Sequence, residues 1–557
     1  MSFSNRFWFS LLACAFLLTG LLGRDVWHGP EAYVFGPIYH FYNHHTWLVP
    51  FNATLPFLEK PPLYYWTGVI FAHAFEQYLP LYDAARLATL FYMVITIVFM
   101  WKAAELLFSS LNEPRRKTLP WITVALALGS MMLVKDAHLM EPDVPLLTGA
   151  SIFLYGASVW LMQPQSHLRS GFWMGAGTGV AFLAKGLFLP VLFAFSVLIM
   201  WGLRRDLQTR HTSYSFAMAL LVALPFLVIW PMLLYLEFPA YFHEWFWENN
   251  VGRFLGFSVE RLGNANKPFL VLIAAPRVTF PLVPLAALAL WYYRREWRQP
   301  WFLLPAVISA IGLAVLTLSA TARPYYLLPL TPAFAMLAAL GLYCLSEKTL
   351  SVLSWITRIA AGLYLSIIWL EWWNLKQPVA IRPLPALVHA LSAWIPANYV
   401  PYNSPWMPLL ALAVTVFWLV ALRLSTRAAL DAALFWFASA AAIWIVRMAL
   451  LMPWLNIAFS DYAPIAQAFE TAKAHGSEAD CIGYDEYLYN EVTSPVLEYI
   501  AATRFPGQRI GGKDCKFILI ASSPDLHIKR FRPYETIWRN DSSWYYGGDI
   551  FWLLQKR

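Results

Sequence analysis

Charged residues are scarce in this sequence: they account for 13% of its 557 residues, whereas 59% are hydrophobic. Soluble domains usually carry about 25% charged residues, so this composition excludes an ordinary soluble protein. The net charge of +8 does not indicate a nucleic-acid partner. The basic residues stand in short loops between apolar runs, which is typical of membrane proteins. We therefore expect membrane lipids as partners and no nucleic acid.

Other familiar signatures are also missing. The sequence contains no internal repeat and no low-complexity segment. The apolar stretch from Phe7 to Gly23 is not followed by a clear small-residue cleavage site, so it is interpreted as an uncleaved first membrane span. We find no paired half-helices and no buried charge in mid-span that would mark an ion path, which argues against a transporter.

Cysteine is rare, with four residues in the whole chain. Cys14 and Cys344 lie in apolar runs and are interpreted as inert packing residues. Cys481 and Cys515 both lie in a polar tail at the end of the chain. This pair fits a disulfide if the tail faces an oxidising compartment, and two free buried thiols are the alternative.

Long hydrophobic segments dominate what is present. A run of about 20 apolar residues crosses a bilayer as a helix, because only a helix or a closed barrel satisfies its backbone polar groups in lipid. We predict an α-helical polytopic membrane protein with about thirteen transmembrane helices within residues 1–452. The predicted spans are residues 7–23, 84–107, 119–134, 144–162, 171–184, 186–202, 215–236, 271–293, 301–319, 324–344, 352–370, 406–422 and 432–452. The shorter stretch 62–76 is interpreted as interfacial or re-entrant, with a membrane span as the alternative.

Basic residues are distributed unevenly between the two sets of loops. Segments such as 115–117, 204–210 and 294–298 are richer in arginine and lysine than the loops 24–83, 135–143 and 237–270. The positive-inside rule places the richer set in the cytoplasm. We therefore predict an inner (cytoplasmic) membrane protein with a cytoplasmic N-terminus. Thirteen crossings then place the tail in the periplasm, where the disulfide would form.

The polar tail, residues 453–557, is predicted to be a soluble α/β domain. Its pattern predicts helices over 463–475 and 491–503 and buried strands at Ile482–Tyr484 and Phe517–Ala521. Two further segments, Ile537–Arg539 and Ile550–Leu554, are predicted edge strands.

Three predicted outer loops carry charged residues beside aromatic ones. Charges at a membrane edge are often functional because burying them in lipid is costly. In the first loop, two prolines of the segment Glu59-Lys60-Pro61-Pro62 fix the backbone and prevent a helix from starting before Leu63. A lysine held there is suited to a phosphate, although a proline-stiffened turn with an ordinary ion pair is the alternative. The other two loops hold Lys135, Asp136, His138, Glu141 and Asp143, and the run Trp245–Phe254.

Five segments follow one another along the chain: Thr46–Pro50 with Phe57–Trp66, Glu141–Asp143, Phe182–Gly186, Trp245–Gly256 and Arg323–Pro329. In this order they resemble segments of the bacterial GT-C glycosyltransferases, and specifically of the aminoarabinose transferases of lipid A and their relatives. The resemblance implies a GT-C type fold and a polyprenyl-phosphate sugar donor. It implies inverting-type transfer of an aminoarabinose-like sugar to lipid A or a similar glycolipid acceptor on the periplasmic side.

The resemblance also suggests which residues act. A leaving polyprenyl phosphate needs cationic partners, which we assign to Lys60, Arg253 and Arg323, with Lys185 as a weaker candidate. The catalytic carboxylates are assigned to Glu31, Asp143 and Glu59.

One position departs from the family pattern. The family usually carries an Asp-Glu pair after the first span and an arginine two residues later, whereas an ungapped alignment places Pro30-Glu31 and Tyr33 there. Either Glu31 or Asp143 supplies the missing carboxylate, or the chain has lost catalysis and binds lipid without reacting. Transfer to a protein or another glycan is a further alternative.

No cofactor is assigned, and a divalent metal near Glu59 is kept as an alternative. A divalent metal near Glu59 would lack nitrogen ligands, because the segment Asn264-Ala265-Asn266, where relatives can place histidines, has none. His40, His44 and His45 are interpreted as solvent-facing or interfacial residues, with a metal site as the less favoured alternative.

Overall fold

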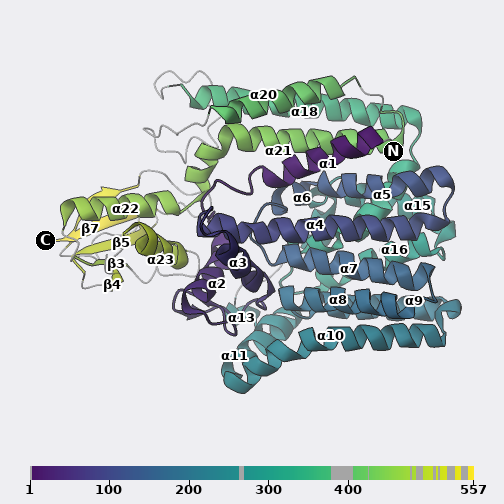
Figure 1. Ribbon diagram of the computed structural model, residues 1–557, viewed down its shortest axis with the longest axis horizontal. Helices are drawn as coiled ribbons and strands as arrows, with labels where there is room; N and C mark the ends of the chain where they lie inside the picture. Colours follow the sequence, from purple (N-terminus) through teal and green to yellow (C-terminus); the bar gives the residue numbers. More distant parts are fainter. Residues whose placement is uncertain are drawn as a thin grey trace.

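A bundle of long helices carries a small mixed domain at one end (Figure 1). We call this the domain end; the N-terminus lies near the opposite end. The computed structural model describes residues 3–262, 267, 269–377, 405–423, 426–476, 480–484, 493–505, 510–511, 515–522, 534–540 and 550–557.

The bundle consists of helices that run between its two ends. Seven helices in the described residues are long and apolar enough to cross a membrane, or up to eight when α14 and α15, bent by 101°, count as one span. This confirms a multi-pass helical membrane protein, whereas the count of about thirteen spans stays a prediction. The bundle helices are α1 (Phe3–Leu18), α4 (Leu81–Leu107), α5 (Glu113–Leu128), α7 (Asp143–Met162), α8 (His167–Lys185), α9 (Phe188–Leu203), α10 (Arg210–Glu237), α14 (Leu270–Val278), α15 (Leu282–Tyr292), α16 (Pro300–Leu318), α17 (Thr331–Tyr343), α18 (Glu347–Leu375), α20 (Trp406–Ala421) and α21 (Ala429–Phe459).

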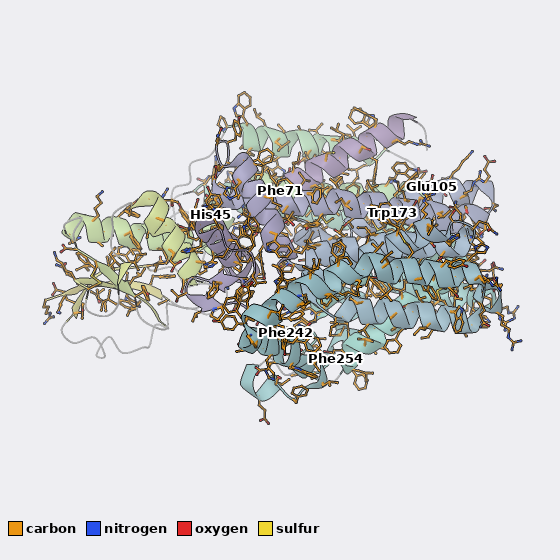
Figure 2. All side chains as sticks on the ribbon, turned by 60° about the horizontal axis from the view of Figure 1, so that its bottom comes forward. His45, Phe71, Glu105, Trp173, Phe242 and Phe254 are labelled. Carbon is orange, nitrogen blue, oxygen red and sulfur yellow. A yellow bond between two sulfur atoms is a disulfide. The ribbon has the colours of Figure 1, made fainter. Side chains whose placement is uncertain are left out.

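The three predicted outer loops gather at the domain end. Figure 2 shows His45, Phe242 and Phe254 toward this end, whereas Glu105 lies toward the other. The loops form short elements: α2 (Pro30–His44), β1 (Phe51–Asn52), β2 (Leu55–Pro56), α3 (Leu63–Phe75), α6 (Met131–Asp136), α11 (Pro239–His243), η3 (Glu244–Gly252), α12 (Arg253–Leu255) and α13 (Val259–Leu262).

Helix α3 replaces the interrupted stretch predicted over 62–76. It begins at Leu63, directly after Pro61 and Pro62, as the two prolines predict. Its 13 residues are fewer than the roughly 20 that cross a bilayer, so α3 alone is too short to be a span.

The C-terminal domain has a five-stranded sheet in the order β4-β3-β5-β7-β6. Strand β3 pairs in parallel with β4 and β5, while β7 is antiparallel to β5 and β6. The predicted helices and strands are confirmed with small shifts of their ends. The elements are α22 (Tyr462–His475), β3 (Ile482–Tyr484), α23 (Thr493–Arg504), β4 (Ile510–Gly511), β5 (Phe517–Ser522), β6 (Tyr534–Arg539) and β7 (Ile550–Lys556).

Two details of the C-terminal region differ from the sequence-based expectation. Strand β7 is not an edge strand, because it pairs on both sides and its run Phe551–Leu554 is buried on both faces. Helix α21 also continues through residue 452, the expected end of the membrane domain, to Phe459. The bundle therefore reaches the C-terminal domain as a continuous helix.

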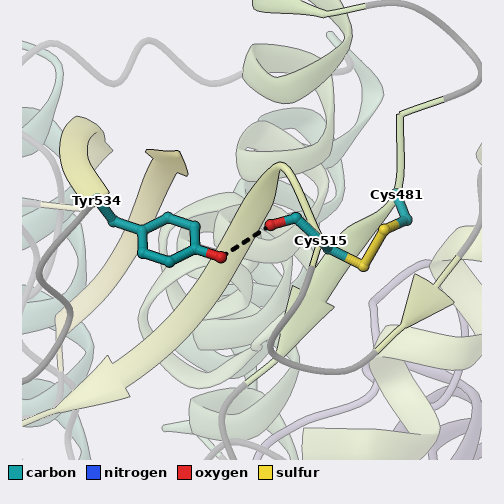
Figure 3. The surroundings of a disulfide bond; sticks show 3 residues. All are labelled: Cys481, Cys515 and Tyr534. Carbon is teal, nitrogen blue, oxygen red and sulfur yellow. Dashed lines mark hydrogen bonds between the residues drawn. A yellow bond between two sulfur atoms is a disulfide. The ribbon is translucent and has the colours of Figure 1, made fainter. Parts of the chain in front are cut away.

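Cys481 and Cys515 form a disulfide, so the alternative of two free thiols is wrong (Figure 3). The Tyr534 hydroxyl donates a hydrogen bond of 3.0 Å to the carbonyl of Cys515. Cys14 and Cys344 are free. Cys14 is exposed on the bundle surface, which corrects its interpretation as a packing residue.

We predict that the purified chain, denatured without reductant, has two thiols that react with a maleimide, and four after reduction. We also expect Cys481→Ser to lower the free energy of unfolding of the C-terminal domain by about 2–4 kcal/mol, because the disulfide restricts the unfolded chain. Mass spectrometry counts the thiols. Four reactive thiols before reduction would contradict the bond.

Candidate functional site

A cavity of about 320 Å³ opens at the domain end, where the three outer loops meet the bundle. Its polar side is formed by five charged residues from four different parts of the chain: Glu59, Lys60, Asp143, Lys185 and Arg253. Its other walls are largely apolar. They include Leu146 of α7, Phe188 and Val191 of α9, Phe254 and Leu255 of α12, and Val315 and Leu316 of α16.

The first charged group joins the first and third loops. Arg253 Nη2 donates a hydrogen bond of 2.8 Å to Glu59 Oε1. Lys60 Nζ lies 3.4 Å from Glu59 Oε2, a longer and weaker contact. Pro61 and Pro62 are buried behind this pair and set the direction in which the chain presents it.

The second charged group joins the second loop to the end of α8. Lys185 Nζ lies 2.6 Å from Asp143 Oδ1 and 2.7 Å from Asp143 Oδ2. The same ammonium group lies 3.9 Å from the ring centroid of Tyr326, which belongs to the 3₁₀ segment η5 (Pro324–Leu330). Asp143 is the first residue of α7, a helix that is buried throughout its length. The carboxylate is therefore held on the most deeply buried of the candidate membrane spans in the described residues.

These contacts leave the cavity suited to an anion. Three cations face two carboxylates among the described lining residues. Arg253 Nε is buried and has no hydrogen-bond partner in the described structure. A buried donor without a partner costs free energy, so a ligand that accepts from it gains affinity. Arginine and lysine are the side chains that proteins use to bind phosphate.

Glu59 is an anion within this site at any ordinary pH. Burial by itself would raise the pKa of Glu59, but the charges of Lys60 and Arg253 outweigh burial and lower the pKa to about 2. A carboxylate with so low a pKa is a weak base. The contacts of Glu59 instead suit it to holding Lys60 and Arg253 in place.

A turn at Gly186 brings η3 against the junction of α8 and α9. Gly186 has φ +81°, a left-handed conformation that favours glycine, and a side chain there would collide with Asn250 Oδ1. Asn250 in turn accepts a hydrogen bond of 3.4 Å from the Leu187 backbone N–H. The turn thus sets the distance between Lys185 and the loop that carries Arg253.

The structure places Glu31 apart from this cavity. Its side chain is 1% exposed and is paired with two buried arginines, with 2.7 Å from Arg24 Nη2 to Glu31 Oε1 and 3.2 Å from Arg86 Nε to Glu31 Oε1. Arg24 and Arg86 outweigh the effect of burial and lower the pKa of Glu31 to about 2. Glu31 also accepts a hydrogen bond of 3.1 Å from the Met140 backbone N–H. These contacts favour a structural role over the predicted role as a base.

The second loop, 135–143, contains two further carboxyl groups close to Asp143. Burial and the charge of Asp143 raise the pKa of Asp136 to about 7, against the opposing effect of Lys135. Burial, Asp136 and Asp143 raise the pKa of Glu141 well above its usual value. Neutral forms are therefore favoured at these two positions, while Asp143 has the direct lysine partner.

Several predicted site residues lie elsewhere. Arg323 precedes η5 and does not line the cavity, although Tyr326 of the same segment does. The rings of His40 and His44 lie 4.6 Å apart, centroid to centroid, and are tilted by 35° to each other. No group of three or more histidine, cysteine, aspartate or glutamate side chains in the described ranges is arranged to hold a metal ion. The segment 264–266 lies outside the described residues.

Sequence reasoning missed some cavity residues. Asn249, Asn250 and Tyr326 all line the cavity and were not singled out. They lie inside the segments 245–256 and 323–329 that carry the resemblance. The resemblance therefore indicated these segments, but it did not indicate which of their side chains line the cavity.

Comparison with known proteins agrees with the resemblance seen in the sequence. The family described as dolichyl-phosphate-mannose-protein mannosyltransferase matches residues 59–230, which include four of the five charged cavity residues. The undecaprenyl phosphate-alpha-4-amino-4-deoxy-L-arabinose arabinosyl transferase 2 of Pseudomonas fluorescens is 25% identical over 68% of this chain and 67% of its own length. The corresponding transferase of Photorhabdus laumondii is 22% identical over 62% of this chain and 61% of its own length.

The fold also has a close solved counterpart. The crystal structure of ArnT from Cupriavidus metallidurans bound to undecaprenyl phosphate matches with a TM-score of 0.70 at 16% identity, over 99% of this chain and 98% of that one. Its apo state matches with a TM-score of 0.68 at 17% identity, over the same shares. The predicted GT-C type of fold is therefore confirmed, and the chain resembles the bacterial aminoarabinose transferases.

We predict that Gly186→Ala lowers the free energy of unfolding by about 1–3 kcal/mol, because it forces a strained backbone and a collision with Asn250. Thermal unfolding in detergent measures this. Gly202→Ala in α9 is the matched control, because its added methyl group meets open space. We expect no loss of stability there, and equal losses in both variants would contradict the role of the Gly186 turn.

We predict that stability falls as the pH rises from about 4 to about 7 and that Asp136→Asn reduces this fall. The folded protein binds a proton at Asp136 in this range, whereas the unfolded chain has released it, so rising pH favours unfolding. Melting temperatures of both proteins at pH 5 and pH 7 give the comparison. An identical pH dependence in the two proteins would contradict the raised pKa.

Proposed function

We propose that this chain, which resembles the aminoarabinose transferases and has the fold of ArnT, is a membrane glycosyltransferase that uses a polyprenyl-phosphate sugar as donor. The observation that carries the proposal is the cavity in which Lys60, Lys185 and Arg253 face apolar walls. A polyprenyl phosphate has an anionic phosphate that the cations can bind and a long hydrocarbon chain that the apolar walls can contact. The finer proposal is that an aminoarabinose-like sugar passes to lipid A or a similar glycolipid.

The donor binds with its phosphate on the cations of the cavity. Lys60 and Arg253 are the primary phosphate ligands, because Lys60 is only loosely paired with Glu59 and Arg253 Nε has no partner in the described structure. The prenyl chain leaves between α9 and α16, where Val191 and Val315 line the wall. Contact with these side chains removes apolar surface from water as the donor binds.

The proposed reaction is a displacement at the anomeric carbon with inversion. An acceptor oxygen forms the new bond to that carbon, the bond to the phosphate oxygen breaks, and the polyprenyl phosphate leaves with the electron pair. Lys60 and Arg253 stabilise the charge that develops on the leaving phosphate. Any proton on the attacking oxygen passes to a carboxylate, for which Asp143 at the cavity wall is the candidate.

The replacement of the family aspartate by Pro30 is compatible with this reaction. A phosphate monoester has a second pKa of about 6, so an acceptor phosphate is largely ionised near neutral pH and needs orientation more than proton removal. Pro30 is the first residue of α2 and lines a different cavity from the one that holds Lys60. Its substitution therefore leaves the phosphate-binding residues of the donor cavity intact.

We further propose that the domain end faces the periplasm and that the chain lies in the inner membrane. The uneven distribution of basic residues between the loops supports this orientation. The disulfide in the C-terminal domain supports it independently, because such bonds persist in oxidising compartments.

We predict that Lys60→Ala and Arg253→Ala each lower sugar transfer by about 10²–10³-fold, because each removes a cationic partner of the leaving phosphate. Mass spectrometry of lipid A from cells that produce each variant shows the transfer as an added sugar mass. Lys117→Ala is the control, since Lys117 is exposed and pairs with Glu113 on the bundle surface.

Unchanged transfer by both cavity variants would contradict the proposal. Absence of transfer by the unmodified chain would instead favour the alternative raised by Pro30, a homologue that binds the carrier lipid without reacting. Gain of transfer in Pro30→Asp would then identify a decayed enzyme. An added sugar on a protein or another glycan would correct the acceptor while leaving the donor site in place.

A further inference from the structure

Two buried side-chain atoms of residues that line the donor cavity have no hydrogen-bond partner in the described part of the chain. One is a donor, Arg253 Nε, which the proposed function assigns to the phosphate. The other is an acceptor, the side-chain oxygen Oδ1 of Asn249, and the proposed reaction gives it no role. A buried polar atom without a partner costs free energy, so it points to a group that a ligand supplies.

The orientation of the Asn249 amide follows from its other contact. Asn249 lies in the π-helical segment η3, and its Nδ2 donates a hydrogen bond of 3.3 Å to the carbonyl of Glu244, five residues earlier. A carbonyl oxygen can only accept a hydrogen bond, so the amide nitrogen must face Glu244. Exchanging the two ends of the amide would therefore lose this hydrogen bond, and Oδ1 is fixed as an acceptor.

The next residue, Asn250, shows the same attachment with a partner present. Its Nδ2 donates a hydrogen bond of 2.9 Å to the carbonyl of Trp245, again five residues earlier. Its Oδ1 accepts a hydrogen bond of 3.4 Å from the Leu187 backbone N–H, within the turn at Gly186. Asn250 thus uses both ends of its amide to hold the structure together, whereas the oxygen of Asn249 has no such partner.

The charge of the acceptor decides which part of the donor it suits. Both carboxylates of the cavity already form ion pairs with its cations. The Asn249 oxygen is uncharged, so it does not compete with a phosphate for these cations. An ionised phosphate only accepts hydrogen bonds and gains nothing from a second acceptor, whereas the hydroxyl and amino groups of a sugar donate them.

Asn249 also stands next to the proposed phosphate ligand Arg253. The two residues are four positions apart in η3 and the adjoining α12, and both line the cavity. Residues four apart on a helix are neighbours on its surface. In a polyprenyl-phosphate sugar, the sugar is bonded directly to a phosphate oxygen. A phosphate on Arg253 therefore brings the groups of the sugar to the neighbourhood of Asn249.

We propose that Asn249 recognises the sugar of the donor, and that its Oδ1 accepts a hydrogen bond from a hydroxyl or amino group of that sugar. This inference rests on the proposed function, which places the donor phosphate on Lys60 and Arg253. It assigns the sugar to a class that presents a hydrogen-bond donor beside the phosphate. A site built to pair with such a group discriminates against an analogue that lacks it, because the buried acceptor is then left without a partner.

Comparing the binding of carrier lipids with and without a sugar tests the proposal. We would titrate the purified full-length chain in detergent with undecaprenyl phosphate and with the same carrier bearing either 4-amino-4-deoxy-L-arabinose or glucose, and follow binding by native mass spectrometry. The ratio of the dissociation constants with and without the sugar measures what the sugar contributes.

Three variants make this comparison specific. Asn249→Leu keeps the branched shape of the side chain and removes its oxygen, whereas Asn249→Asp keeps an acceptor oxygen. Asn112→Leu is the matched control, because Asn112 is exposed and makes no side-chain capping hydrogen bond at the start of α5. Thermal unfolding shows whether each variant folds. If Asn249→Leu does not fold, Asn249→Ala removes the same oxygen with a smaller side chain.

We expect the unmodified chain to bind one of the sugar-bearing lipids about fivefold to tenfold more tightly than undecaprenyl phosphate. Asn249→Leu should abolish this advantage and leave the affinity for undecaprenyl phosphate unchanged. Asn249→Asp should keep the advantage, because it keeps the acceptor, even if its added charge weakens the binding of all three lipids alike. Asn112→Leu should behave as the unmodified chain does.

The same sugar advantage in a folded Asn249→Leu variant and in the unmodified chain would overturn the proposal. Equal losses for the lipids with and without a sugar would also overturn it, because they would indicate a role in phosphate binding or in the structure of the loop. In both cases, weaker binding of every carrier lipid by Lys60→Ala would leave the proposed function standing. If the unmodified chain binds none of the three lipids, the proposed function fails and this inference fails with it.

Discussion

Buried charges must be paired, and one such network fixes the geometry on which the donor cavity depends. Glu31 is held between Arg24 and Arg86, and it also accepts a hydrogen bond from the backbone of Met140. Arg24 reaches the carbonyl of His138, so the first and second outer loops share a single charged core. Removing one partner from such a network leaves an uncompensated buried charge, which is strongly destabilising. The position of the loop 135–143 therefore follows from these ion pairs.

That loop organises the proposed chemistry. It presents Asp143 to a cavity whose cations suit a phosphate and whose walls suit a hydrocarbon chain, and it presents Lys135 to a second, larger cavity. A reaction between two membrane lipids requires each headgroup to arrive at the same point while its chains stay in the bilayer. In the proposed function, the apolar walls of the donor cavity hold the prenyl chain while Lys60 and Arg253 hold its phosphate.

The sequence was most informative where chemistry is local. The order Glu59-Lys60-Pro61-Pro62 identified a fixed acid–base pair, and the structure brings it to Asp143 and Arg253 in one cavity. It was least informative where partners come from distant segments. The pairing of Glu31 with Arg86, the neighbours of β7 and the contact of Lys185 with Asp143 depend on tertiary packing, which no local pattern reports. Arg447 of α21 lies inside the predicted span 432–452 and was overlooked, because the hydrophobicity averaged over a span hides one charge.

The most direct test of the account is an experimental structure of this chain with undecaprenyl phosphate bound. The account predicts the phosphate in contact with Lys60 and Arg253, and the prenyl chain between α9 and α16 along Val191 and Val315. A phosphate bound elsewhere would contradict the assignment of the donor site.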